Sequence, residues 1–174
     1  MTLRLVLSAL AGFTPAIFTL PALGFGNPSN PMTNMLKIKG SCIDAVKIFG
    51  RHFKKPTCKP LINTRYKDNR TGFYFMTDNT ILTFSGAAPQ VKTSADSVIQ
   101  PIDLILFNDY EKGDPNNPNK LRAAGACKFA NPYQGISITI ECDAETSQGR
   151  FAGKFRTDGS KPITLMERGK LLTP

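Results

Sequence analysis

The chain has 174 residues, with 22 Lys and Arg against 13 Asp and Glu and a formal net charge of +9. This length suits one domain with a hydrophobic core, and the charge favours anionic partners. The sequence has one histidine, four cysteines without Cys-x-x-Cys spacing, and no phosphate-binding glycine loop, dinucleotide fingerprint or Gly-x-Ser-x-Gly motif. It therefore indicates no metal, no cofactor and no catalytic residues, and we expect a protein that is not an enzyme.

The first 24 residues have the pattern of a cleaved signal peptide. Arg4 gives a basic start, residues 5–23 are uncharged and largely apolar, and small side chains precede Phe25 where a signal peptidase would cut. A membrane anchor is the alternative, but Pro15 and Pro21 interrupt the run and no basic stop-transfer cluster follows directly. We therefore predict a secreted or periplasmic protein that does not span the membrane after cleavage.

The mature chain begins with a lead-in and then one domain. Residues 25–34 are rich in Gly, Asn, Pro and Ser, which predicts a flexible segment, and residues 35–174 form the predicted domain. Met35 to Lys39 alternates apolar and basic residues, as in a half-buried strand. Ser41 to Asp44 resembles a capping box, and apolar residues recur at helical spacing up to Phe49, so a short helix is one prediction for Ser41–Phe49 and a strand is the other.

From Pro60 onward, short strand patterns alternate with turn signals. The predicted strands are residues 61–66, 73–76, 81–84, 97–107, 121–129, 136–142, 151–157 and 163–166. Phe73 to Met76 is apolar on both faces, which predicts a central strand, while Pro101 predicts a bend or a sheet edge. No strand–helix–strand alternation is present, so we predict an all-β fold: an antiparallel β-sandwich or small β-barrel of about seven or eight strands.

The cysteines predict two disulfides. All four, Cys42, Cys58, Cys127 and Cys142, follow the leader, and an even count in an exported protein favours pairing. Three connectivities are open, and we favour Cys42–Cys58 with Cys127–Cys142. Each would close a loop of about 15 residues and stabilise the fold by about 3 kcal/mol.

The positive charge is concentrated in residues 37–70. This segment has ten basic residues against Asp44 and Asp68, whereas residues 71–174 have equal numbers of both signs. Dense positive charge attracts polyanions. We predict a binding surface made of Lys47, Arg51, His52, Lys54, Lys55, Lys59 and Arg65. A solvated face that only aids solubility is the alternative.

Acidic residues offer a second candidate site. Glu141, Asp143 and Glu145 alternate along one strand face, as paired carboxylates for glycoside hydrolysis or a cation site could do. A hairpin turn at residues 146–149 would place Glu145 opposite Arg150 and Glu141 opposite Lys154, and we favour such ion pairs over catalysis. The oxygen-rich loop at residues 109–117 departs from the twelve-residue calcium pattern, so we expect a plain turn.

Aromatic residues of the strand at 73–76 offer a third candidate. Phe73, Tyr74 and Phe75 could form a platform for a sugar, but aromatic side chains in a central strand favour a core position.

We therefore predict an exported, non-enzymatic binding module with a basic surface at residues 37–70. Its expected partner is an anionic polymer, a lipid head group or an acidic protein, and the sequence contains no specific nucleic-acid motif. The alternatives are a protein–protein interaction or inhibitor protein of the cell envelope and, third, a hydrolase of an envelope polymer.

Overall fold

The computed structural model describes residues 29–43, 47–48, 51–52, 58, 60–77, 80–109 and 118–172. For residues 47–48, 51–52 and 109 it describes the backbone alone. The predicted signal peptide, residues 1–24, and the first part of the predicted lead-in lie outside these ranges.

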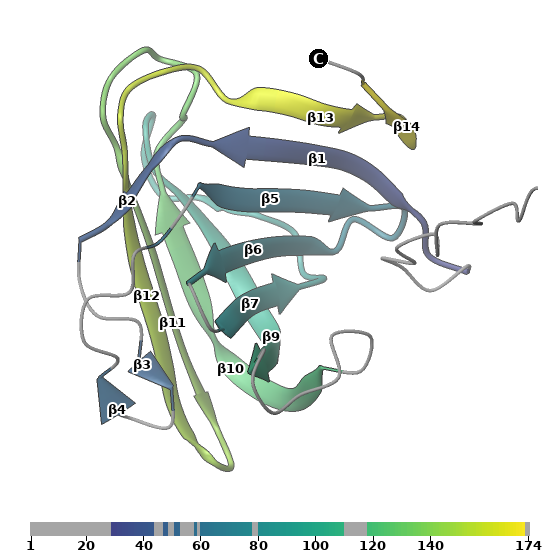
Figure 1. Cartoon of the computed structure of the whole chain (residues 1–174), viewed down its shortest axis with the longest axis vertical. Coiled ribbons are helices and arrows are strands. Elements are labelled where there is room, and N and C mark those ends of the chain that lie inside the picture. The colour runs from purple at the N-terminus through teal and green to yellow at the C-terminus, as the bar shows by residue number, and fades with distance from the viewer. Residues whose placement is uncertain are drawn as a thin grey trace, which may run out of the picture.

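The described residues form fourteen strands and no helix (Figure 1). The strands are β1 (Met32–Ile38), β2 (Gly40–Cys42), β3 (Lys47–Ile48), β4 (Arg51–His52), β5 (Leu61–Tyr66), β6 (Thr71–Met76), β7 (Thr80–Gly86), β8 (Val91–Lys92), β9 (Val98–Asp109), β10 (Asn119–Phe129), β11 (Thr139–Thr146), β12 (Gly149–Thr157), β13 (Ile163–Glu167) and β14 (Lys170–Leu171). Accordingly, no helix in this part of the chain could cross a membrane.

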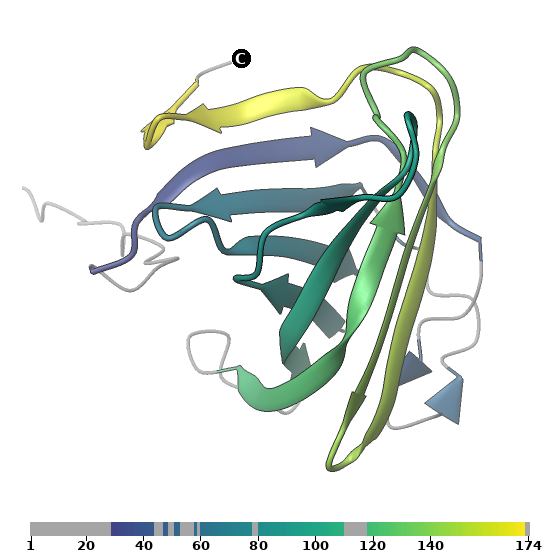
Figure 2. The same ribbon diagram turned by 180° about the vertical axis from the view of Figure 1, so that it is seen from behind.

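All strands belong to one antiparallel sheet. Its order is β14-β13-β1-β5-β6-β7-β9-β10-β11-β12-β3-β4, with β2 paired to β12 and β8 paired to β9. The sheet curls so that β5, β6 and β7 face β11 and β12 across the interior, giving a half-barrel (Figures 1 and 2).

The all-β antiparallel prediction is confirmed, and two of its details are corrected. The described sheet has twelve strands on its main path instead of seven or eight, and it is a half-barrel and not a sandwich. The short strands β3, β4 and β14 on this path, and β2 and β8 beside it, have two or three residues each. Segments this short carry too few residues to show an alternating pattern.

The predicted helix at Ser41–Phe49 is absent from the described residues of that segment. Cys42 lies in β2 and pairs with Phe155 of β12, while Lys47 lies in β3 and pairs with Ala152 of the same strand. Ile43 continues this pairing, because its backbone N–H donates to the Lys154 carbonyl oxygen at 3.1 Å. Hydrogen bonds to β12 thus outweigh the weak local preference for a helix.

Gly40 allows the chain to pass from one side of the half-barrel to the other. β1 pairs with β5 and β13, whereas β2, which follows directly, pairs with β12. Gly40 has a φ of 149°, and a Cβ there would lie 2.8 Å from the Phe155 ring. The bend links β1 to β12 of the opposite wall at this end of the molecule, which we call the closed end. The opposite end of β1, β5 and β6 is the open end.

Several predicted strands match the structure closely. β5 has the predicted bounds, and β6 lies between β5 and β7 as a central strand. Pro101 pairs with Ala126 on one side, while the pairing of β7 with β9 stops at Leu104 on the other, so Pro101 lies at a local edge as predicted. β1 begins at Met32, within the predicted lead-in, because Met32 pairs with Tyr66.

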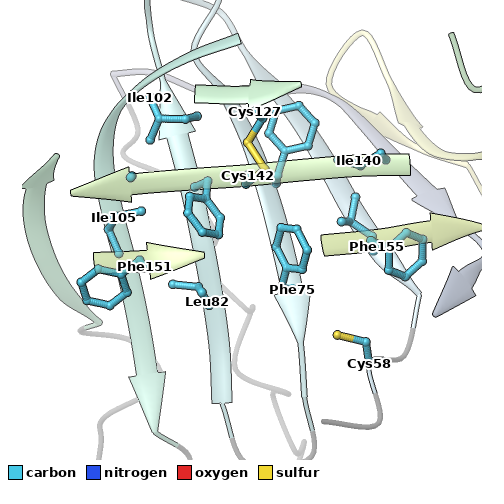
Figure 3. Close-up of a cluster of buried hydrophobic side chains, with 14 of the residues drawn as sticks. Cys58, Phe75, Leu82, Ile102, Ile105, Cys127, Ile140, Cys142, Phe151 and Phe155 are labelled. Atoms are coloured by element: carbon cyan, nitrogen blue, oxygen red, sulfur yellow. A yellow bond between two sulfur atoms is a disulfide. The ribbon is translucent and has the colours of Figure 1, made fainter. Parts of the chain in front are cut away.

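The core fills the concave face of the half-barrel. Phe75 of β6 and Leu82 of β7 face Cys142 of β11 and Phe155 of β12, and all four side chains are buried (Figure 3). Gly153 lets the two walls approach, because a Cβ there would lie 2.8 Å from the Phe75 ring. This packing holds the two halves of the curled sheet together.

The aromatic residues of β6 belong mostly to the core. Phe73 and Phe75 are 2% and 1% exposed in the core cluster, which confirms the core interpretation for both. Tyr74 points to the other, convex face, where its hydroxyl lies 3.1 Å from that of Tyr66. Burial, together with Tyr66, raises the pKa of Tyr74.

Two disulfides fasten the sheet. Cys127 and Cys142 are directly opposite one another on β10 and β11, with Cα atoms 4.0 Å apart. Cys42 of β2 is joined to Cys58, with Cα atoms 5.2 Å apart. The connectivity is therefore the sequential one. Two disulfides are compatible with an oxidising extracellular or periplasmic location.

Candidate functional site

The concave face changes character along its strands, from apolar at the closed end to polar at the open end. In β5, Leu61 is fully buried in the core, while Asn63 and Arg65 follow on the same face at successive alternate positions. In β6 the order runs in the opposite direction, from Thr71 to Phe73. The polar residues of neighbouring strands therefore meet at the open end.

These residues line a pocket of about 140 Å³. We call it the polar pocket, and its lining comprises Asn34 and Leu36 of β1, Asn63 and Arg65 of β5, Thr71 of β6, and Gln90 from the link between β7 and β8. The sheet register fixes the wall, because Asn34 lies opposite Arg65, Leu36 opposite Asn63, and Arg65 opposite Thr71.

The backbone beneath the polar pocket is well anchored. The Asn63 side-chain amide donates to the Gly72 carbonyl oxygen at 3.0 Å, which fixes the orientation of that amide across two strands. The Thr33 hydroxyl donates to the Arg65 carbonyl oxygen at 3.0 Å. Arg65 therefore projects from a position held by ladder bonds to β1 and β6 and by an added side-chain bond.

The guanidinium of Arg65 has no protein counter-ion among the residues that the structure describes. The carboxylates at this end of the sheet have other partners. Asp103 accepts two hydrogen bonds from Arg70, the shorter at 2.6 Å, and Asp68 accepts one from the Arg70 backbone N–H at 2.9 Å. Arg65 is thus an exposed, unpaired cation among neutral hydrogen-bonding groups.

The other predicted binding residues lie elsewhere. Lys47, Arg51 and His52 are in β3 and β4, beyond β12 at the far edge of the sheet from β5 (Figure 1). Lys54, Lys55 and Lys59 lie outside the described residues. Of the seven residues predicted to form the binding surface, Arg65 lines the polar pocket.

The acidic row is an ion-paired ladder on the convex face. Glu145 lies opposite Arg150 and Glu141 opposite Lys154, as predicted, with nitrogen–oxygen distances of 3.8 Å and 3.6 Å. Arg150 also reaches diagonally to Asp143 at 2.5 Å, and these hydrogen bonds raise the pKa of Arg150. We call these five residues the charged ladder. Their mutual pairing explains the row without catalysis.

Five of the pocket residues were not predicted from the sequence. Asn34 fell within the predicted lead-in, and Gln90 lies in a link without a periodic pattern. Alternation in the predicted strand 61–66 does contain a signal, because it places Asn63 and Arg65 on the same side as Leu61. Polar residues at core-facing positions of a strand indicate a site or a cavity mouth.

The chain was compared with protein-family models, with curated proteins and with solved structures, and no match was found in any of the three. The oxygen-rich loop predicted at residues 109–117 lies, apart from the backbone of Asp109, outside the described residues.

Proposed function

We propose that this protein is an exported, non-enzymatic binding module that holds an anionic polymer through unpaired basic residues, with the polar pocket as its main contact. The observation that carries the proposal is Arg65, which has no counter-ion among the described residues and lies in a pocket lined otherwise by neutral groups. An unpaired guanidinium retains its full capacity for an external carboxylate, sulfate or phosphate.

The distribution of ion pairs supports this proposal. The described acidic residues of β11 and Asp103 of β9 are paired with Arg150, Lys154 and Arg70. Lys67, two residues after Arg65, is exposed and makes no ion pair with a described residue. The charged ladder thus has three acidic and two basic residues, whereas at the open end Arg65 and Lys67 outweigh Asp68. This net positive charge favours association with a polyanion there.

The test measures binding of the disulfide-bonded protein, purified after export, to polygalacturonate and heparin at several salt concentrations. We expect affinity to fall by at least about tenfold between low and high salt, because screening weakens contacts between exposed charges. Dextran, a neutral polysaccharide, is the control and should not bind. Equal binding to dextran, or binding that is insensitive to salt, would contradict the proposal.

A protein partner is the second candidate, and apolar side chains at one sheet edge favour it. Ile163 of β13, Leu171 of β14 and Leu172 are 41%, 72% and 44% exposed. Exposed apolar side chains at an edge are typical of protein contacts. If this edge is the functional surface, association should persist at high salt and be lost on Leu171→Glu, while Arg65→Gln leaves it unchanged.

A further inference from the structure

We infer that the polar pocket recognises a uronic acid unit, with its carboxylate on Arg65 and its ring hydroxyls on the surrounding side chains. The inference rests on the proposed function and specifies which polymer it concerns. Three features of the pocket carry it: the shape of the charged group, the chemistry of the neutral lining, and the size of the space.

The charged group favours a carboxylate. A guanidinium presents parallel N–H donors in a planar fork, which matches the two oxygens of a carboxylate. Arg70 already binds Asp103 in this bidentate manner, through Nη1 at 2.6 Å and Nη2 at 3.2 Å. Arg65 carries the same group and has no such partner among the described residues, so an external carboxylate can take the corresponding position.

The neutral lining favours hydroxyl groups beside that carboxylate. Asn34, Asn63 and Gln90 each combine an amide donor with a carbonyl acceptor. Thr71 adds a hydroxyl that donates to the Asn69 carbonyl oxygen at 3.4 Å and can still accept a hydrogen bond. A simple inorganic anion needs donors alone, whereas sugar hydroxyls both donate and accept. The side chains of Asn34 and Gln90 make no hydrogen bond to a described residue, so their capacity is available to a ligand.

The size and the apolar wall suit one sugar ring. The pocket of about 140 Å³ is smaller than the several hundred Å³ that drug-sized ligands occupy. Leu36 offers an apolar surface, opposite Asn63 in the register, against which the C–H face of a ring can pack. A single uronate can therefore enter while the rest of a polymer stays outside, near the exposed Lys67.

The test is an NMR titration of the disulfide-bonded protein with methyl glucuronide, methyl glucoside and inorganic phosphate. We expect the glucuronide to shift the signals of Asn63 and Arg65 and to bind at least about tenfold more tightly than either control, because the ligand's carboxylate and hydroxyls act together. Equal affinity for the glucoside would overturn the role of the carboxylate. Equal affinity for phosphate would overturn the role of the hydroxyls.

Three variants locate the binding. Arg65→Gln should reduce glucuronide affinity by about tenfold, and Arg65→Lys, which keeps the charge without the fork, should cause a smaller loss. Lys128→Gln is the matched control, because it removes an equal charge from an exposed position of β10, outside the pocket lining, and should leave the affinity within about twofold. Equal losses for Lys128→Gln and Arg65→Gln would overturn the inference.

Polymer binding by the same variants separates this inference from the proposed function. If Arg65→Gln still binds polygalacturonate with full salt-sensitive affinity, the pocket inference fails, together with the role of the polar pocket as the main contact, while the proposed binding of an anionic polymer by basic residues stands. If the unmodified protein binds the glucuronide but no anionic polymer, the proposed function fails and the pocket assignment stands. We expect neither result: polymer and glucuronide affinity should fall together in Arg65→Gln.

Discussion

The charged ladder and the polar pocket both bring charged and polar side chains together on neighbouring strands, yet their chemistry differs. On the convex face of β11 and β12, each carboxylate lies within 4 Å of a cation, since Glu141 has Lys154 and both Asp143 and Glu145 have Arg150. On the concave face, Arg65 lies opposite Asn34 and Thr71, which are neutral. A paired charge is occupied, whereas an unpaired one is available to a ligand.

The comparison shows that counting charges along the sequence is a weak guide to a binding surface. The described basic residues of 37–70 are divided among β1, the link from β1 to β2, β3, β4, β5 and the turn before β6. Arg70, within that stretch, is paired with Asp103. Which residue lies opposite a cation on the next strand decides whether the cation can act on a partner.

Disrupting the core packing between the two walls of the half-barrel, which carry the polar pocket and the charged ladder, should have the largest effect on stability. Gly153→Val would push a side chain into the Phe75 ring, which lies 2.8 Å from the position of a Cβ. We expect a loss of about 2 kcal/mol in the free energy of unfolding, because overpacking a filled core strains both walls. Urea denaturation under non-reducing conditions measures it.

Ala152→Val is the matched control for this substitution. Ala152 is half-buried and precedes Gly153 in β12, so its side chain points to the convex face of the sheet. Its register partner on β11 is Asp143. Its enlargement should change the free energy of unfolding by less than about 0.5 kcal/mol. Equal losses for the two variants would show that the Phe75 contact does not hold the walls together.

Removing one positive charge from the polar pocket, or one from the charged ladder, should separate effects on binding from effects on stability. Arg65→Gln should lower uronate affinity about tenfold and leave the urea midpoint unchanged, because the described structure gives Arg65 no ion pair to lose. Arg150→Gln should leave uronate affinity unchanged and lower the urea midpoint slightly, because Asp143 and Glu145 lose their partner. Calorimetric titration and urea denaturation of both variants measure these effects. The reverse pattern would refute the distinction between the regions.

Alkaline pH should have the smallest effect, and it concerns the convex face behind the polar pocket. Burial raises the pKa of Tyr74 in the folded protein above the ordinary value near 10, which the unfolded chain retains. A raised folded pKa contributes stability that is fully present below about pH 10 and is lost as the pH rises through the folded value. The urea midpoint should therefore begin to fall near pH 10 and continue to fall at higher pH, and less so in Tyr74→Phe. An identical fall in both proteins would assign the effect to other groups.

The sequence predicted the parts of the fold that local patterns determine. The strand and turn patterns gave β5 its bounds. The apolar character of residues 73–76 predicted buried positions for Phe73 and Phe75, and the turn signal after β11 predicted the pairing of Glu145 with Arg150. These features depend on residues close together in the chain or on a period of two. The antiparallel class followed from the short spacing between strands.

The rest required contacts between distant segments. β2 and β3 form because residues 40–43 and 47 pair with β12, more than a hundred residues later, and nothing in their own sequence indicates that partner. The polar pocket likewise unites β1, β5, β6 and Gln90. Asn63 and Arg65 were visible as polar residues on a core-facing side, but only the register shows that Asn34 lies opposite Arg65.

The most direct test gives the polar pocket its own carboxylate. Asn34→Asp places an acid opposite Arg65, at a position whose present side chain makes no hydrogen bond to a described residue, and so makes the pocket resemble the charged ladder. We predict that uronate affinity, measured by calorimetric titration, falls at least about tenfold while the urea midpoint is retained. Asn34→Gln, which stays neutral, should keep most of the affinity. Unchanged affinity in Asn34→Asp would contradict the claim that an unpaired Arg65 holds the anionic partner.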